Sequence, residues 1–357
     1  MKKILVTYRL LPEAFSPYQQ KYDLIFPTKG SFSENEIVEL IPECDALLSM
    51  FNMPINKNII QQGKNLKIIS NYGVGFNNID LDEAKRKNIV VTNTPDPVIE
   101  PTAELAFALM SDLARKISLC DKRLKSKENI QWGVLENLGA GLYGKTLGII
   151  GLGRIGKAVA KRAIAAGMNI VYYNRHRLPI EEEKKYNATY YSKNDLLRTS
   201  DYISLHTPLN ESSFHLMDEN SLRIVKKGAF IINTARGAVI DEIALLSSLE
   251  SGHLGGAALD VYENEPTITE GLLHLDNVVL VPHIGTATIS KSSSNSVGKS
   301  LKLWTVKSTS LSNNAISNSF VKRPLESMLY NWEVVILSPF VLMISKSICS
   351  PVILVKS

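Results

Sequence analysis

Short apolar runs alternate with polar, helix-like stretches over the first hundred residues. Four of these runs are typical of buried β-strands and lie at residues 2–8, 46–50, 66–71 and 88–93. Residues 33–40 predict a helix between them, because Ser33 can cap its start and Glu36 stands three positions later. Strands that alternate with helices predict a parallel sheet with right-handed crossovers.

A second α/β pattern follows a proline-rich break at residues 94–101, which predicts a domain boundary. Residues 102–119 predict one long helix with apolar periodicity, and residues 145–174 read as strand, glycine-rich turn, helix and strand. Further strands are predicted at residues 201–206, 229–234, 256–262 and 277–283. Their number and spacing fit a doubly wound, nucleotide-binding sheet.

The amino-acid composition and charge limit the classes of protein to which this chain can belong. The 357 residues are 45% hydrophobic and 21% charged, which is typical of a globular protein with more than one core. The net charge of +5 comes from residues 277–357, with eight basic and two acidic residues, whereas the remainder holds 32 basic and 33 acidic residues. Because the main body is neutral, nucleic acid is not an expected partner.

The first ten residues and the cysteines indicate a cytoplasmic protein. The apolar run that begins at Ile4 is too short for a secretory signal and predicts a first strand. Cys44, Cys120 and Cys349 are far apart and form no C-x-x-C pair, so we expect a reducing compartment and no structural metal site.

A glycine-rich turn is the first candidate binding site. Gly151, Gly153 and Gly156 have the spacing G-x-G-x-x-G, with Arg154 and Ile155 between the last two. The first glycine permits the tight turn, the second allows the backbone to approach a pyrophosphate, and the third lets helix and strand pack closely. The helix that follows offers free N–H groups to phosphates. We therefore expect a nicotinamide dinucleotide here.

The end of the next strand bears on which dinucleotide binds. Asn174 stands where an NAD site usually places an acidic residue, and Arg175 and Arg177 follow it. No carboxylate there repels a 2′-phosphate, and two guanidinium groups can pair with one. The sequence thus predicts a preference for NADPH, with NADH as the alternative.

Three candidate catalytic residues follow predicted strands, namely Arg236, Glu265 and His283. Reduction of a 2-keto acid needs a cation that holds the carboxylate and carbonyl, which suits the forked guanidinium of arginine. It also needs a proton donor near neutrality, which suits histidine. A carboxylate beside that histidine fixes its tautomer and favours its protonated form.

The chain resembles the D-isomer-specific 2-hydroxyacid dehydrogenases, and most closely their glyoxylate/hydroxypyruvate reductase branch. The matching stretches occur in the family's order and lie at residues 71–80, 101–110, 144–160, 205–218, 232–242, 257–266 and 277–288. The resemblance implies two Rossmann-like domains with a cleft between them: a flavodoxin-like substrate domain at 1–100 and a doubly wound dinucleotide-binding domain at 101–287.

The resemblance also implies a role for each matching residue. His283 would be the acid/base, Glu265 its partner and Arg236 the substrate anchor. Backbone N–H groups of Val74 and Gly75 would hold the substrate carboxylate. The positions that would line the nicotinamide ribose and amide are Thr207, Pro208, Ala235 and Asp260.

The implied reaction is NAD(P)H-dependent reduction of a small 2-keto acid, such as glyoxylate or hydroxypyruvate, to the D-2-hydroxy acid. Alternatives are an NADH-linked D-lactate- or phosphoglycerate-type dehydrogenase and a dinucleotide-sensing binding protein with this fold. The resemblance further implies a homodimer, with the helix from Thr102 and the segment around Trp132 at its interface.

Residues 288–357 depart from the family pattern. An amphipathic helix that returns to the first domain is expected after Thr288, but residues 290–320 contain eleven serines and no acid. An altered reading frame or a lineage-specific extension would produce such a segment, and we favour the first. The apolar run near the end is interrupted by Pro339, Lys346 and Pro351, which disfavours a membrane span.

Overall fold

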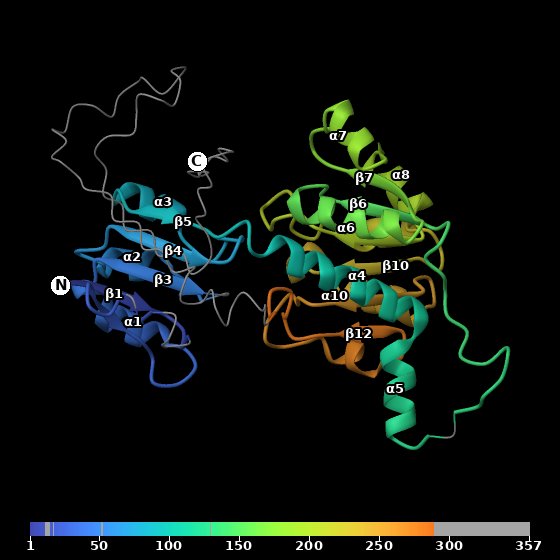
Figure 1. Ribbon diagram of the computed structural model, residues 1–357, viewed down its shortest axis with the longest axis horizontal. Helices are drawn as coiled ribbons and strands as arrows, with labels where there is room; N and C mark the ends of the chain where they lie inside the picture. Colours follow the sequence, from blue (N-terminus) through green and yellow to red (C-terminus); the bar gives the residue numbers. More distant parts are fainter. Residues whose placement is uncertain (11–14, 17, 51–52, 129, 289–357) are drawn as a thin grey trace. The chain divides into compact units, whose positions relative to one another are not determined.

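The structure, a computed structural model, describes residues 1–10, 15–16, 18–50, 53–128 and 130–288. These residues form two compact units, Met1–Pro97 and Val98–Thr288, each with its own parallel sheet and its own core (Figure 1). The serine-rich basic segment predicted at 288–357, its apolar run and Cys349 lie outside the described residues, apart from Thr288.

The first unit is built on a five-stranded sheet with the order β2-β1-β3-β4-β5, in which all pairs are parallel. Its strands are β1 (Lys2–Val6), β2 (Tyr22–Ile25), β3 (Ala46–Met50), β4 (Ile68–Tyr72) and β5 (Val90–Thr92). The four predicted strands are confirmed. The strand β2 was not predicted, because it is a short edge strand without a continuous apolar run. This strand order is that of flavodoxin-like folds.

Helices cover this sheet because alternate strand residues point to opposite faces. The helices are α1 (Glu34–Leu40), α2 (Lys57–Gln62) and α3 (Leu81–Arg86), with a 3₁₀ turn at Ile41–Glu43. Ser33 and Glu36 form the predicted capping box at the start of α1. Leu5 packs with Ile37 and Ile59 on one face, whereas Ile4 and Val6 belong to a separate cluster on the other.

The second unit has a seven-stranded parallel sheet with the order β12-β11-β10-β9-β6-β7-β8. Its strands are β6 (Thr146–Ile150), β7 (Asn169–Tyr173), β8 (Ala188–Tyr190), β9 (Tyr202–Leu205), β10 (Phe230–Asn233), β11 (Gly256–Leu259) and β12 (Val278–Leu280). The chain reverses its direction of winding between β6 and β9, and this switch point is where doubly wound sheets bind dinucleotides.

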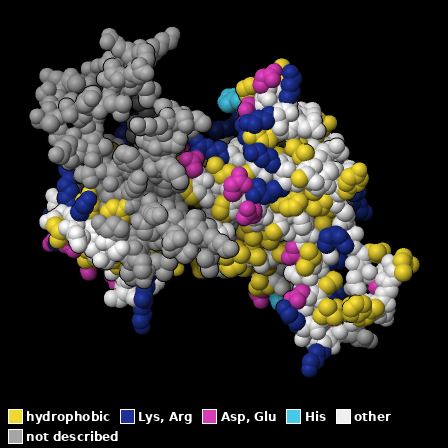
Figure 2. Space-filling model, viewed as in Figure 1, with side chains coloured by type: hydrophobic (Ala, Val, Ile, Leu, Met, Phe, Trp, Pro, Cys, Tyr) yellow, Lys and Arg dark blue, Asp and Glu magenta, His cyan; other side chains and the backbone are white. Residues whose placement is uncertain are grey.

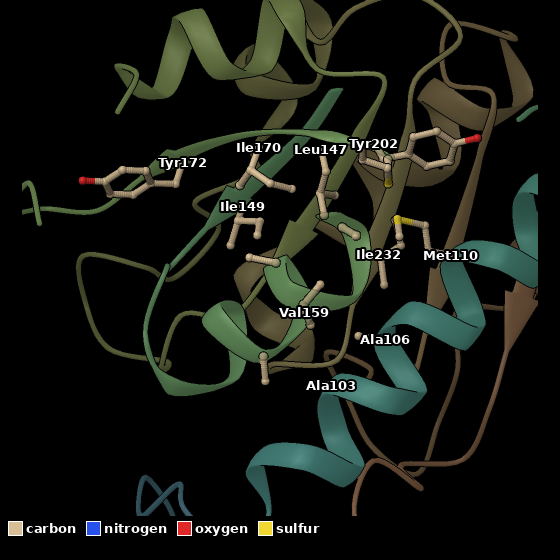
Figure 3. Packing of buried hydrophobic residues seen from close by; sticks show 14 of the residues in the cluster. Ala103, Ala106, Met110, Leu147, Ile149, Val159, Ile170, Tyr172, Tyr202 and Ile232 are labelled. Atoms are coloured by element: carbon tan, nitrogen blue, oxygen red, sulfur yellow. The ribbon is translucent and has the colours of Figure 1, made fainter. Parts of the chain in front are cut away.

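Seven helices lie in the described part of this unit: α4 (Ile99–Arg115), α5 (Ile117–Lys125), α6 (Arg154–Ala165), α7 (Ile180–Lys185), α8 (Lys193–Thr199), α9 (Glu219–Ile224) and α10 (Glu242–Glu250). Two 3₁₀ turns occupy Gly237–Val239 and Glu270–His274. Figure 3 shows Ala106 and Met110 of α4 near Leu147 and Ile232 of the sheet, with Val159 of α6 in the same cluster. None of these helices is long and apolar enough to cross a membrane.

The predicted single helix at 102–119 is two helices, so that prediction was wrong in extent. Lys116 adopts the left-handed conformation with φ 55° and separates α4 from α5. The Ala114 carbonyl is then free to accept a hydrogen bond from the Ala140 N–H at 2.7 Å, and the Asp112 side chain accepts one from Ser118 N–H at 2.7 Å. Contacts with residues distant in sequence therefore decide where α4 ends.

Candidate active site

The glycine-rich turn connects β6 to α6 at the switch point of the second sheet. Gly151 has φ +99°, and a Cβ there would lie 2.8 Å from the His206 carbonyl, so only glycine fits. A Cβ on Gly156 would lie 2.4 Å from the Gly151 carbonyl oxygen. The Cβ position of Gly153 has no described atom within 4 Å, and no side chain caps α6. The turn thus leaves its backbone open to a phosphate group.

Asn174 follows β7 and is tied to this turn. Its Oδ1 accepts a hydrogen bond of 2.7 Å from the Leu152 N–H. The amide thereby orders the residue between the first two glycines. Arg175, next in the chain, is exposed and makes no hydrogen bond or ion pair with any described residue.

Arg177 is held by α7. Its Nε and Nη2 donate to the two carboxylate oxygens of Glu183 at 2.8 and 2.9 Å, a bidentate pair. The Tyr172 hydroxyl donates to the same carboxylate at 2.7 Å. Hydrogen bonds from Arg177 and Tyr172 lower the pKa of Glu183 to about 2. The charge of Arg177 is therefore already compensated, unlike that of Arg175.

His283 and Glu265 form a pair beyond the ends of β12 and β11. Nδ1 of His283 lies 2.9 Å from Oε2 of Glu265. Oε1 of Glu265 accepts a hydrogen bond of 3.1 Å from the Tyr262 N–H. Burial raises the pKa of Glu265, but its hydrogen bond and attraction to His283, with help from Tyr262 and Arg236, outweigh burial and lower it. The ionised carboxylate binds Nδ1 and so fixes the orientation of the imidazole ring.

Asp260 binds the backbone of the two residues that follow His283. Its carboxylate accepts hydrogen bonds from the N–H groups of Ile284 at 2.6 Å and Gly285 at 2.9 Å. His283 has φ +51°, an unfavourable conformation for a residue with a Cβ. Burial raises the pKa of Asp260 to about 6, against the opposing effect of the two N–H groups and His283. We infer that Asp260 stabilises this bend.

Arg236 follows β10, the neighbour of β11 in the sheet. The Asn233 side chain accepts from the Ala235 N–H and donates to the Arg236 carbonyl, at 3.0 and 2.9 Å. Burial lowers the pKa of Arg236 and the charge of Glu265 opposes this effect. A Cβ on Gly237 would lie 1.8 Å from the Tyr262 carbonyl carbon, so the turn after Arg236 packs directly against the segment that carries Glu265.

Thr207 and Pro208 follow β9, next to the glycine turn. The Thr207 N atom would lie 3.0 Å from a Cβ on Gly151, and the Thr207 hydroxyl is buried with no hydrogen-bond partner among the described residues. A buried hydroxyl without a partner is costly and suits a site that a ligand completes. The open Gly153 backbone and this hydroxyl both fit a dinucleotide.

Val74 and Gly75, whose backbone N–H groups were predicted to bind the substrate carboxylate, lie after β4 in the first unit.

A family model described as D-isomer specific 2-hydroxyacid dehydrogenase, NAD binding domain, matches residues 107–285. The chain belongs to this dehydrogenase family. It is therefore an oxidoreductase that uses a nicotinamide dinucleotide, and the predicted enzyme class, fold class and family are confirmed.

Glyoxylate reductases of two archaea are similar to most of the chain. A glyoxylate reductase of Thermococcus litoralis is 42% identical over 291 residues, which are 80% of this chain and 88% of the relative. A glyoxylate reductase of Pyrococcus horikoshii is 45% identical, with 80% and 87% covered.

Solved structures agree with the fold. A glyoxylate reductase from Paecilomyes thermophila has a TM-score of 0.74 and 35% identity, with 83% of this chain and 92% of that chain covered. An NADPH-dependent glyoxylate/hydroxypyruvate reductase from Sinorhizobium meliloti, in complex with NADP and malonate, has a TM-score of 0.72 and 27% identity, with 84% and 90% covered.

Two residues that support the site had not been singled out from the sequence. Glu242, the first residue of α10, is buried and accepts hydrogen bonds of 2.6 Å from the Glu263 N–H and the Thr269 hydroxyl. An acidic residue in a first helical turn is common for other reasons, so the sequence carries no clear signal of this contact. Asn233 directly precedes the turn to Arg236, and an asparagine at a strand end is a weak signal for such a contact.

The described residues contain no cluster of three or more His, Cys, Asp or Glu that could hold a metal ion.

Proposed function

We propose that this protein reduces a small 2-keto acid of the glyoxylate or hydroxypyruvate type to the D-2-hydroxy acid. The observation that carries the proposal is the His283–Glu265 pair of 2.9 Å beside the half-buried side chain of Arg236, at the ends of three adjacent strands. The names of the relatives support glyoxylate as the first substrate to test. We assign the first unit to substrate binding and the second to the dinucleotide.

Each residue has a role that follows from its chemistry. Arg236 would bind the substrate carboxylate and polarise the keto oxygen through its forked N–H groups. His283 would donate a proton from Nε2 to that oxygen as it becomes an alcohol, while Glu265 stabilises the imidazolium. Backbone N–H groups of Val74 and Gly75 would bind the carboxylate. The reduced nicotinamide, when bound, supplies the hydride to the keto carbon.

The glycine turn at Gly151, Gly153 and Gly156, with Arg154 and Ile155, would hold the pyrophosphate. Thr207, Pro208 and Ala235 would line the nicotinamide ribose and amide. The resemblance implies that Asp260 also lines the nicotinamide. Its carboxylate, however, accepts two backbone hydrogen bonds from the residues that follow His283. We therefore propose that Asp260 acts by shaping the His283 bend.

The preference for NADPH would depend on Arg175. Arg177 is paired with Glu183, and the side-chain oxygen of Asn174 is bound to the Leu152 N–H. Arg175 is exposed and has its charge available for a 2′-phosphate. Arg175→Ala should weaken NADPH binding about tenfold or more and leave NADH binding unchanged. Arg198→Ala, an exposed arginine on α8, is the matched control for fluorescence titrations. Tighter binding of NADH than NADPH by the native chain would contradict the preference.

The main test measures oxidation of NADPH and NADH by the full chain with glyoxylate or hydroxypyruvate. His283→Ala should retain cofactor binding and lose about 10²- to 10⁴-fold in kcat, because a positioned general acid contributes that much. Near-native turnover of this variant would refute the assignment. A native chain that binds NADPH but turns over neither acid would support a dinucleotide-sensing role instead.

We further propose a cytoplasmic homodimer. The segment after α5 exposes the apolar side chains of Trp132, Val134, Leu135, Leu138 and Tyr143. Figure 2 shows hydrophobic side chains gathered on the projecting part of the second unit where Figure 1 labels α5. Apolar side chains grouped in this way favour association with another surface. The two described cysteines, Cys44 and Cys120, are free thiols, as expected in a reducing compartment.

A further inference from the structure

The turn that carries Val74 and Gly75 is held from the loop after β5. Nδ2 of Asn93 donates a hydrogen bond of 2.8 Å to the Val74 carbonyl oxygen. The Thr94 N–H donates to the Gly73 carbonyl at 2.9 Å. Two consecutive carbonyl groups of the turn are thus bound by two consecutive residues of the neighbouring loop.

These contacts set the direction of the N–H groups, because a peptide unit is planar and trans. The Gly73 carbonyl shares its peptide plane with the Val74 N–H, and the Val74 carbonyl shares its plane with the Gly75 N–H. In a trans peptide the C=O and N–H point to opposite sides. Binding both carbonyls toward residues 93–94 therefore directs both N–H groups away from that loop.

The two N–H groups are available to a ligand. Neither Val74 N–H nor Gly75 N–H donates a hydrogen bond to any residue that the structure describes. Successive free N–H groups in a turn form an anion-binding concavity. A hydrogen bond accepted by a peptide carbonyl also polarises the N–H of the same unit and makes it a better donor.

Hydrogen bonds also hold the remainder of the turn. Thr94 Oγ1 accepts from the Gly73 N–H at 3.0 Å and donates to the Asn71 carbonyl at 2.8 Å. The Asn71 side chain, which is buried, donates to the Gly75 carbonyl. The side-chain contact from Asn93 is the one that acts directly on the peptide between Val74 and Gly75 and can be removed without cutting into the buried core.

We propose that Asn93 is a positioning residue for carboxylate recognition: its amide orients the Gly75 N–H toward the substrate carboxylate. This inference rests on the proposed function, since it takes the Val74–Gly75 turn as the carboxylate site. Asn93 itself does not touch the substrate. Its effect is on affinity for the acid, not on the chemical step.

The experiment compares Asn93→Ala and the nearly isosteric Asn93→Asp with the native chain. The matched control is Asn65→Ala, which removes an exposed side-chain hydrogen bond to the Pro42 carbonyl in the same unit. Binding of oxamate, a non-reacting 2-keto acid analogue, is measured calorimetrically with NADPH present, and KM and kcat are measured for glyoxylate and its neutral methyl ester. Thermal unfolding of each variant checks that it folds.

Asn93→Ala should weaken oxamate binding and raise KM for glyoxylate about five- to tenfold, the effect of losing one hydrogen bond, with kcat unchanged. The ester lacks the anion, so its kcat/KM should change little. Asn93→Asp should raise KM further, because it loses the donor and adds a negative charge near the anion. The additional rise in KM of Asn93→Asp over Asn93→Ala should become smaller as the salt concentration increases, because salt screens the charge.

Two results with the variants would overturn the inference. One is a native KM for glyoxylate in both variants, and the other is an equal loss with acid and ester, which a merely structural role would produce. Failure of the proposed function is a different outcome: a native chain that binds oxamate in an Asn93-dependent way yet turns over no 2-keto acid. A native chain that does not bind oxamate would overturn the inference as well.

Discussion

Glu265 and Glu183 are both largely buried glutamates that pair with a potential cation, but their partners give them different roles. Glu265 faces an imidazole, a group that can gain and lose a proton near neutral pH. Glu183 faces a guanidinium, which stays charged, and a tyrosine hydroxyl. The first pair therefore suits proton transfer, and the second suits the stability of the loop after β7.

Glu265→Gln keeps a hydrogen-bond acceptor for His283 but removes the negative charge that favours the protonated imidazole. We expect kcat for reduction to fall about 10- to 100-fold, a part of what the whole acid/base contributes. Steady-state kinetics with glyoxylate measure kcat, and a native kcat in this variant would show that Glu265 does not act on His283.

Glu183→Gln should lower the midpoint of thermal unfolding at pH 7. The pKa of Glu183 is about 2 in the folded chain, below the usual glutamate value of 4.5, so the carboxylate stabilises the fold fully above about pH 4.5. This contribution is lost as the pH falls toward 2. The difference between variant and native midpoints should therefore shrink between pH 5 and pH 3, whereas the exposed Glu181→Gln should match the native chain at every pH.

At the scale of elements, the start of α10 anchors the segment that carries Glu265. Asp241 caps the helix by accepting from the N–H groups of Ile243 and Ala244. The buried Glu242 carboxylate then binds the Glu263 N–H on one side of Glu265 and the Thr269 hydroxyl on the other. His215 adds a contact of 2.7 Å to the Glu263 side chain. The helix thus fixes a loop that contains no helix or strand.

Glu242→Ala should cost about 1–3 kcal/mol in the free energy of unfolding, because the partly buried Glu263 N–H and the Thr269 hydroxyl lose their acceptor. We also expect a lower kcat, since Glu265 is less well placed against His283. Glu242→Gln retains one acceptor oxygen, so its free energy of unfolding and its kcat should both lie closer to the native values than those of Glu242→Ala. Urea denaturation and steady-state kinetics measure them, and an alanine variant with native kcat would show that α10 does not position Glu265.

At the scale of the whole molecule, the apolar segment after α5 bears on the assembly. The hollow beside it is lined by Leu119, Leu135, Leu138 and Leu273. Both features lie in the second unit, which also holds the glycine turn and the His283–Glu265 pair. We propose that a second copy of the chain covers this surface.

Trp132→Asp should convert a dimer at micromolar concentration into a monomer in sedimentation equilibrium, since it would bury a charge in an apolar contact. Ile243→Asp is the control, because Ile243 is an exposed apolar residue on α10 outside this segment. A native chain that sediments as a monomer would exclude the homodimer at that concentration.

Local signals in the sequence determined most of the fold. The glycine spacing predicted the turn at 151–156 because the need for a positive φ and for close backbone approach is a property of each glycine. Apolar runs predicted nearly all the strands, since a strand buried on both faces must be apolar throughout. The candidate residues Arg236, Glu265 and His283 were found by their place after strands, which the parallel sheet brings to one edge.

Only the tertiary structure decided which of the polar side chains are free. Arg177 and Arg175 are alike in sequence, but α7 folds back and supplies Glu183 to one of them. Asn93 contacts Val74 because β4 and β5 are neighbours in the sheet, although 19 residues separate the two. The end of α4 at Lys116 likewise depends on Ala140. Each depends on a hydrogen bond between different segments of the chain, and such a bond exists only after the elements have packed.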